Sequence, residues 1–201
     1  MKFSLPVVGL MAASVLAQEP VEQPIVDAIA VIQSRTQKVD ADVLAWSGDR
    51  RGFIPIFFDS QKLLKSINNG TTVANANEPL DFNGAVNVGL ATLNLIPIVN
   101  QTLIDYIAAI PKFNKLYLTP TVLDSLNQQK AASDVFSAAV VAKVPADLQG
   151  LAGTITAPID EDFDVAIAAF QAAVDSLPKW PHHPKGWTGW GWRWGRGWGW
   201  Y

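Results

Sequence analysis

The sequence predicts an all-α fold, an antiparallel bundle of four to six helices, of which five is the expected number. Apolar residues recur at three- and four-residue spacing over several long segments, as they do on the buried face of a helix. Alternating strand patterns are nearly absent from the 201-residue chain, and alanine is abundant. The chain has no cysteine, so packing alone must stabilise it, and a helical bundle meets that requirement most easily.

The first 17 residues have the composition of a secretory signal peptide. Lys2 gives a basic start, residues 3–16 are largely apolar, and small residues precede an expected cleavage after Ala17. This apolar run is too short to span a bilayer. Every later apolar segment is interrupted by proline, asparagine, aspartate or lysine within roughly 18 residues, so no transmembrane helix is expected.

Two helices are expected in the first half of the chain. Pro20 and Pro24 precede apolar residues at helical spacing, which predicts a helix over residues 25–46. Residues 47–52 break this pattern with two glycines. A second helix is then expected from about residue 53 to residue 76, with a candidate interruption at residues 68–70, Asn-Asn-Gly.

The second half predicts three more helices. Residues 80–110 form the longest periodic segment, with an expected kink near Pro97. Pro111 and Pro120 bound a short stretch, after which residues 122–144 again have helical spacing. The last helix is expected over residues 145–177, with a candidate break at residues 157–158, Ala-Pro.

The composition changes abruptly after Pro178. Seven of the eight tryptophans follow it, interleaved with glycines that disfavour a stable helix. Residues 18–178 contain 10 basic and 18 acidic residues, a net charge of −8, whereas residues 179–201 carry +4. We therefore expect a signal peptide at residues 1–17, a helical domain at residues 18–178 and a disordered, cationic Gly/Trp-rich tail at residues 179–201. The acidic domain argues against nucleic-acid binding.

No catalytic residue, metal site or cofactor is predicted. The histidines, His182 and His183, both lie in the expected tail, where a base cannot be held in place for a catalytic triad. Adjacent histidines between prolines, with no third ligand nearby, are typical of a polar linker, although a transition-metal site is an alternative. The acidic residues 160–164 lack the spacing of a calcium loop, and we interpret them as the start of a helix.

Two sequons predict N-linked glycans in a secreted chain, at Asn69 and Asn100. Asn69 lies in the turn-like stretch and is the better candidate, whereas Asn100 lies in the middle of an expected helix.

Two groups of residues are candidates for binding. Apolar helical faces predict either an ordinary core or, because Gly84, Gly89 and Pro97 interrupt close packing, a lipid-sized cavity between helices. The cavity hypothesis rests on Phe57, Leu64, Leu93, Ile96, Leu103, Phe136, Val140, Ile167 and Phe170. In the tail, tryptophan with arginine suits a surface that is apolar on one side and wet or anionic on the other, unless the segment has no function. The surface-binding candidates there are Trp187, Trp190, Trp192, Arg193, Trp194, Arg196, Trp198 and Trp200.

The order of these segments resembles the fungal hydrophobic surface-binding protein A family, which overlaps the cell wall galactomannoproteins. The matching features are the signal peptide, residues 25–46, residues 80–110, Val122-Leu123-Asp124-Ser125-Leu126 with Lys130 and Phe136, Lys143-Val144-Pro145 and the helix at residues 163–170. The family has no short catalytic motif, so the resemblance depends on pattern and order. The Trp-rich tail departs from the Ser/Thr-rich region or wall anchor that often follows the domain in this family.

The resemblance implies a secreted, non-catalytic protein of the cell wall or medium that binds hydrophobic solid surfaces, fatty acids or other lipids. Binding of cell wall glycan, or help to a secreted hydrolase on hydrophobic polymers, is a further implication. Two alternatives stay open: a structural cell wall mannoprotein without a specific ligand, and a membrane-active protein that acts through the Trp/Arg tail.

Overall fold

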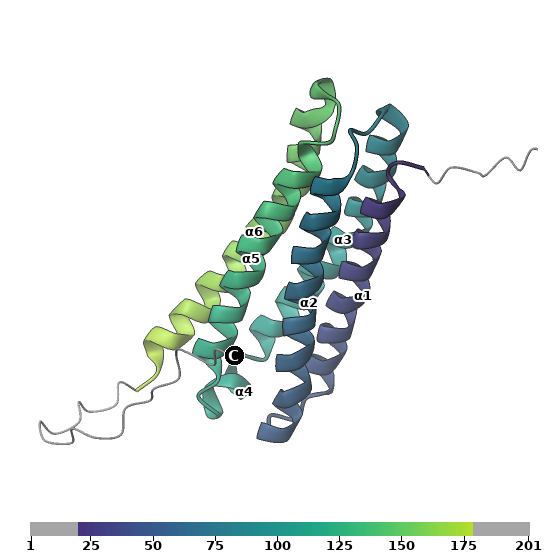
Figure 1. Cartoon of the computed structure of the whole chain (residues 1–201). Helices are drawn as coiled ribbons and strands as arrows, with labels where there is room; N and C mark the ends of the chain where they lie inside the picture. Colours follow the sequence, from purple (N-terminus) through teal and green to yellow (C-terminus); the bar gives the residue numbers. More distant parts are fainter. Residues whose placement is uncertain (1–19, 179–201) are drawn as a thin grey trace, which may run out of the picture.

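The computed structural model describes residues 20–178, and within that range every regular element is a helix (Figure 1). The helices are α1 (Gln23–Ala45), α2 (Arg50–Ala76), α3 (Phe82–Ala108), α4 (Ile110–Lys115), α5 (Thr119–Val141) and α6 (Ala146–Ser176). The predicted all-α bundle is confirmed, with five long helices and the short α4 in the stretch bounded by Pro111 and Pro120. The expected signal peptide and the whole of the expected tail lie outside the described residues.

The five long helices form a closed ring. α1 packs against α2 and α3, α2 packs against α5, α5 against α6, and α6 against α3 (Figure 1). Consecutive long helices run in opposite directions, but α2 and α3 are separated by α1, and α3 and α5 by α6. Each long helix therefore turns one face to its two neighbours and to a common centre.

Aspartate side chains cap the N-termini of two helices, α2 and α3. The Asp49 carboxylate accepts a hydrogen bond from the Gly52 amide at 3.1 Å, and Asp81 accepts one from the Gly84 amide at 2.7 Å. These bonds satisfy amides that have no partner inside the first turn of a helix. α2 therefore begins at Arg50, three residues before the expected start, because Asp49 caps it.

Two predicted interruptions are wrong. Residues 68–70 lie inside α2, where Gly70 allows close approach of the neighbouring helices: a Cβ atom there would lie 3.1 Å from Phe136 and 3.4 Å from Ile32. The glycine serves packing between helices and does not end one. Pro158 lies inside α6, which continues on both sides, as α3 does around Pro97.

The interpretation of the acidic residues 160–164 as a helix start is also wrong. They lie in the middle of α6, which begins at Ala146. They face other partners instead: Asp164 lies 3.7 Å from Lys130 of α5, and Asp162 accepts a hydrogen bond from Asn100 of α3 at 2.6 Å. These residues link α6 to its two neighbours in the ring.

Figure 1 shows the short α4 at one end of the ring, and aromatic side chains from several helices pack together at that end. This aromatic floor consists of Trp46, Phe53, Tyr106, Phe113 and Phe170. Phe113 of α4 is fully buried, with its ring 4.7 Å from that of Trp46, 6.0 Å from Tyr106 and 5.9 Å from Phe170. The Lys112 ammonium donates to the Trp46 carbonyl at 2.6 Å and so ties α4 to the end of α1.

At the opposite end of the ring, hydrogen bonds join the α2–α3 connection to the α5–α6 connection. The Lys143 ammonium donates to the carbonyls of Asn75 and Asn77, at 3.0 and 2.7 Å, where α2 ends. The Leu80 amide donates to the Lys143 carbonyl at 2.8 Å. No aromatic cluster is found at this end within residues 20–178.

α3 is more apolar than expected from the sequence, where no segment was predicted to be long and apolar enough to cross a membrane. By length and composition alone α3 could cross a membrane: its most apolar 18-residue window has a mean hydropathy of 1.4, and 28% of that window is buried inside the bundle. In the ring, Leu95 and Val99 of α3 face the core, whereas Phe82, Leu90 and Leu93 are exposed. The excess hydrophobicity of α3 therefore lies partly on the outside of the bundle.

The substitution Gly52→Ala tests the start of α2. An added Cβ atom would lie 2.6 Å from both the Asp49 carboxylate and the Trp46 ring, so either the cap or the ring must move. We expect the free energy of unfolding to fall by about 1 to 2 kcal/mol. The matched control is Gly150→Ala in α6, where a Cβ atom meets nothing within 4 Å. Helix propensity predicts that it raises the free energy of unfolding by up to about 1 kcal/mol. Urea denaturation followed by circular dichroism measures both changes, and equal effects would contradict the packing argument.

Candidate functional site

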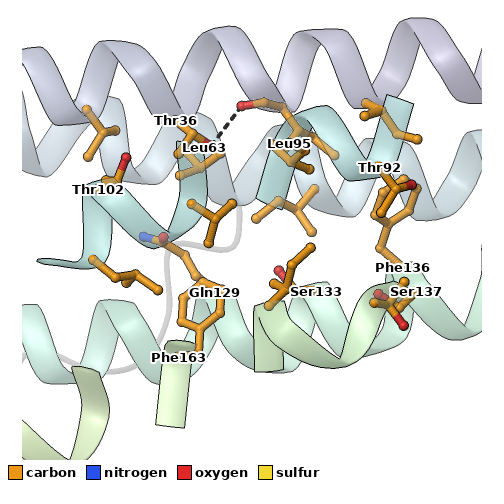
Figure 2. Close-up of a pocket in the computed structure, with 18 of the residues that line it drawn as sticks. Thr36, Leu63, Thr92, Leu95, Thr102, Gln129, Ser133, Phe136, Ser137 and Phe163 are labelled. Atoms are coloured by element: carbon orange, nitrogen blue, oxygen red, sulfur yellow. Dashed lines mark hydrogen bonds between the residues drawn. The ribbon is translucent and has the colours of Figure 1, made fainter. Parts of the chain in front are cut away.

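A cavity of about 60 Å³ lies at the centre of the ring and is lined by residues from all five long helices (Figure 2). Its walls are mainly apolar, with Ile32 from α1, Leu63 from α2, Leu95 from α3, Phe136 from α5 and Phe163 from α6. None of the described residues that line it is charged. The cavity therefore suits an uncharged, mainly apolar group.

A row of polar side chains runs along the cavity face of α5. Gln129, Ser133 and Ser137 follow one another at four-residue spacing, so they lie on one side of the helix (Figure 2). The Gln129 amide donates to the Ser125 hydroxyl at 3.1 Å. The hydroxyls of Ser133 and Ser137 have no hydrogen-bond partner among residues 20–178 and are therefore available to a bound group.

The threonines of the cavity are different, because their hydroxyls are already bonded within their own helices. Thr36 donates to the Ile32 carbonyl at 2.9 Å, and Thr102 donates to the Ile98 carbonyl at 2.8 Å. Their methyl groups add to the apolar wall. The polar character that a ligand meets is thus concentrated on α5.

Tyr106 of the aromatic floor also lines the cavity. Its hydroxyl and that of Ser60 lie 2.8 Å apart, a hydrogen bond that joins α3 to α2 across the ring. Burial raises the pKa of Tyr106 to about 12, so the phenol stays neutral at physiological pH. No charged side chain lines this end of the cavity among the described residues.

An apolar groove of about 250 Å³ lies between α3, α6 and the end of α5. Phe82, Leu90 and Leu151 on its rim are 62%, 55% and 60% exposed, values typical of surface residues although all three side chains are large and apolar. The groove and the central cavity share Thr92, Val140 and Thr156 in their walls. The cavity is therefore next to an apolar opening on the α3–α6 side of the ring.

The structure places the predicted apolar residues in four different surroundings. Leu103, Phe136 and Val140 line the cavity, and Leu93 joins Val140 in the groove. Phe57 borders a small pocket between α2 and α5. The others pack elsewhere: Leu64, Ile96 and Ile167 are half-buried against the core, and Phe170 belongs to the aromatic floor.

Sequence reasoning missed the polar row on α5. Its signal is present in the sequence, because Gln129, Ser133 and Ser137 share a helix face with Phe136 and Val140. Polar residues repeated at four-residue spacing within a buried stripe indicate a cavity or a buried contact.

The sequence profile of the family described as hydrophobic surface binding protein A matches residues 23–142. The chain belongs to this family. The matched range covers α1 to α5, and α6, which completes the ring, follows it.

Two relatives of this family member are cell wall mannoproteins. The chain is 28% identical over 176 residues to cell wall mannoprotein 1 of Aspergillus flavus, and 27% identical over 179 residues to that of Aspergillus fumigatus. Each alignment covers 88% of this chain, but the chain spans only 63% and 62% of the length of these relatives.

Solved structures share the fold of this family member. The crystal structure of Afmp4p in complex with palmitic acid matches with a TM-score of 0.72 at 23% identity, over 74% of this chain and 99% of that one. Ligand-binding domain 1 of the Penicillium marneffei MP1 protein, complexed with arachidonic acids, matches with a TM-score of 0.71 at 19% identity, over 75% and 98% of the two chains.

The two predicted glycosylation sites of this hydrophobic surface binding protein A domain have different surroundings. Asn69 is exposed on α2, whereas Asn100 is half-buried and its side-chain amide donates to Asp162. A glycan on Asn100 would have to break that bond between α3 and α6. The tail residues proposed to bind surfaces, and both histidines, lie outside the described range. No cluster of metal-ligating side chains occurs within residues 20–178.

Asp40 of α1 and Asp105 of α3 form a pair of neighbouring carboxyl groups. One oxygen of Asp40 is buried and has no hydrogen-bond partner among the described residues. Burial, with repulsion from Asp105, raises the pKa of Asp40 to about 6. Asp59 is the opposite case, because hydrogen bonding to Lys62, together with Lys38 at 3.2 Å, lowers its pKa to about 2.

Asp40→Asn tests the carboxyl pair in this family member. A pKa raised on folding contributes stability that is complete below the unfolded value near 3.9 and is lost as the pH rises through about 6. At pH 7 we therefore expect Asp40→Asn to raise the free energy of unfolding by about 1 kcal/mol, after allowance for solvent screening. Near pH 4 the gain should disappear.

Asp59→Asn is the matched control, with the opposite sign. The pKa of Asp59 is lowered on folding, so its contribution is present at pH 7 and is lost only as the pH falls toward 2. This variant should be less stable than the parent at pH 7. Urea denaturation at pH 4 and pH 7 measures both, and a pH-independent effect of Asp40→Asn would contradict the assignment.

Proposed function

We propose that this chain is a secreted, non-catalytic protein that binds one acyl chain of a fatty acid or similar lipid inside the helical ring. The observation that carries this proposal is the central cavity, which has an apolar wall, no charged lining residue and an adjacent apolar groove. Burial of hydrocarbon contributes about 0.8 kcal/mol for each methylene, so a long chain is favoured over a small polar ligand.

The cavity must widen to accept a long chain. A void of 60 Å³ has room for a few water molecules and not for a lipid tail. The groove of 250 Å³ shares three wall residues with the cavity, so separation of α3 from α6 joins the two spaces. We infer that the chain enters from the groove and extends toward Tyr106.

The polar row on α5 gives the ligand an orientation. A carboxyl group accepts hydrogen bonds readily, and the Ser133 and Ser137 hydroxyls are donors without another partner within residues 20–178. The hydrocarbon then lies along the aliphatic and aromatic wall that faces α5. An amphiphile with one polar end satisfies both parts of the cavity.

The comparisons support this proposal. Two solved structures with the same fold are complexes with palmitic acid and with arachidonic acids, and the family is described by its binding to hydrophobic surfaces. The curated relatives are cell wall mannoproteins, which supports secretion to the wall or the medium, with residues 1–17 as the signal peptide. Adhesion by the Trp/Arg-rich residues 179–201, glycosylation at Asn69, and contacts with wall glycan or a secreted hydrolase belong to the same proposal.

A structural role in the wall is a second candidate. Asn69 is exposed on the outside of α2, where a glycan meets no neighbouring helix, and the curated relatives are named as mannoproteins. Extraction of the protein with the wall in the absence of any bound lipid would favour this role.

The substitution Ser133→Phe tests the cavity. The added ring fills the space beside the half-buried Ser133, so we expect the full chain to lose bound palmitic acid in native mass spectrometry. The matched control is Ser34→Phe on the exposed face of α1, which should bind palmitic acid like the parent.

A double variant, Ser133→Ala with Ser137→Ala, separates the polar contact from the filling of space. Loss of hydrogen bonds to the carboxyl group of the ligand should weaken palmitic acid binding roughly tenfold, with little change in helix content. Retention of palmitic acid at parental affinity by both the Phe variant and the double Ala variant would overturn the proposed site.

A further inference from the structure

α2 is the one long helix among the described elements with an excess of basic residues. It contains Arg50, Arg51, Lys62 and Lys65 but a single acid, Asp59, which gives it a net charge of +3. Residues 18–178 as a whole carry −8. α6, which lies across the ring from α2, contains six acidic residues and no lysine or arginine.

The basic residues of α2 share one face with exposed apolar side chains. At about 100° per residue, residues 50, 51, 54, 57, 58, 62 and 65 fall within an arc of roughly 140°. All seven are exposed, including Ile54 at 52%, Phe57 at 37% and Phe58 at 57%. We call this set the outer face of α2. It extends about 22 Å along the helix, at 1.5 Å per residue.

The single acid of α2 lies away from this face. Asp59 is 7% exposed and is held by Lys38 of α1 at 3.2 Å and by Lys62 at 2.6 Å. Arg50, Arg51 and Lys65 have no ion-pair partner within residues 20–178. Their charges are therefore not neutralised by the described part of the chain.

The outer face is separate from the proposed acyl-chain site. α2 contributes Leu63 and Ile67 to the central cavity, on its opposite side, and contributes nothing to the groove between α3 and α6. α1 and α5 flank α2 in the ring, and in Figure 1 no helix covers its outer side. Neither the core nor the cavity accounts for Ile54 and Phe58 on the surface.

We propose that the outer face of α2 docks on the surface of a bilayer that contains anionic phospholipid. Arg50, Arg51 and Lys65 contact the lipid phosphates. The apolar side chains of the face enter the boundary between headgroups and acyl chains. An apolar strip flanked by cations is the arrangement that such a surface requires. The acidic α6, on the far side of the ring, is repelled by the same surface, so the molecule docks in one orientation.

Asn69 lies at one end of the docking surface. It is exposed and follows Lys65 by four residues, about one turn further along the same face. A glycan there stands at the end of the contact. The experiment therefore uses full-length protein without glycan.

The test is co-sedimentation of the full chain with vesicles of phosphatidylcholine alone or mixed with phosphatidylglycerol. Binding should require phosphatidylglycerol and weaken with salt. Arg50→Gln with Arg51→Gln should weaken binding roughly thirtyfold, since each cation near an anionic surface contributes about a factor of five. Arg35→Gln with Lys130→Gln removes the same charge from α1 and α5 and should have a much smaller effect.

A second pair of variants tests the apolar part. Phe58→Ser should weaken binding, whereas Val135→Ser on α5 should not, although both parent side chains are 57% exposed. Because the chain has no cysteine, Gln61→Cys and Glu161→Cys each accept a single environment-sensitive fluorophore. With anionic vesicles, emission from position 61 should shift to the blue, and emission from position 161 in α6 should not.

Two outcomes would overturn the proposal. Equal losses in the Arg50/Arg51 and Arg35/Lys130 variants would show that net charge, and not this face, governs binding. Unchanged binding in both the Arg50/Arg51 and Phe58 variants would assign the contact to another segment, such as residues 179–201. Palmitic acid binding, measured in parallel, should be the same in all variants, so failure here is distinct from failure of the acyl-chain site.

Discussion

A ring of five helices leaves a space at its centre that the helix backbones cannot fill. With neighbouring axes 8 to 10 Å apart, five axes lie about 7 to 9 Å from the middle of the ring, beyond a helix radius of about 5 to 6 Å. Only large side chains directed inward can fill the remainder. Phe136 and Phe163 do so in part, but serine and threonine occupy other inward positions and leave the cavity of 60 Å³. The cavity thus follows from helix number and from small residues at particular positions.

The two ends of this space are built differently, which gives it a direction. Five aromatic side chains pack at the end near α4, and one of them, Tyr106, borders the cavity and shares a hydrogen bond with Ser60. The side toward α3 and α6 is open as the groove. Both helices contain an internal proline, Pro97 and Pro158, as α2 does at Pro55, and each proline removes one amide donor from its helix. The end near α4 is thus filled by aromatic rings in mutual contact, whereas the side toward α3 and α6 is bordered by exposed apolar side chains.

Helix identity was predictable from the sequence, whereas the faces that meet in the centre were not. Periodicity and prolines located all five long helices to within a few residues, because those signals act within one helix. Gly70 was misinterpreted because its role is contact with Ile32 and Phe136 of two other helices. Leu93 and Phe170 were predicted together for the same reason: both lie on apolar stripes, but only the ring order assigns one to the groove and the other to the floor. Phe57, on the outer face of α2, was predicted to line a cavity, since sequence alone does not distinguish a buried phenylalanine on an apolar helix face from an exposed one.

Charge is segregated around the ring in a way that relates the two proposed sites. The positive α2 has α1 and α5 as neighbours, so α3 and α6 are the helices on the other side. The groove lies between those two, along the first part of α6, the helix that contains six acids. A molecule docked through α2, as proposed, presents its groove away from the bilayer. Exchange of an acyl chain then takes place on the side that faces the medium or the wall. The negative charge of the lipid surface attracts the basic α2 and repels the acidic α6. Surface attachment and acyl-chain uptake are thus separate events on opposite sides of one small bundle.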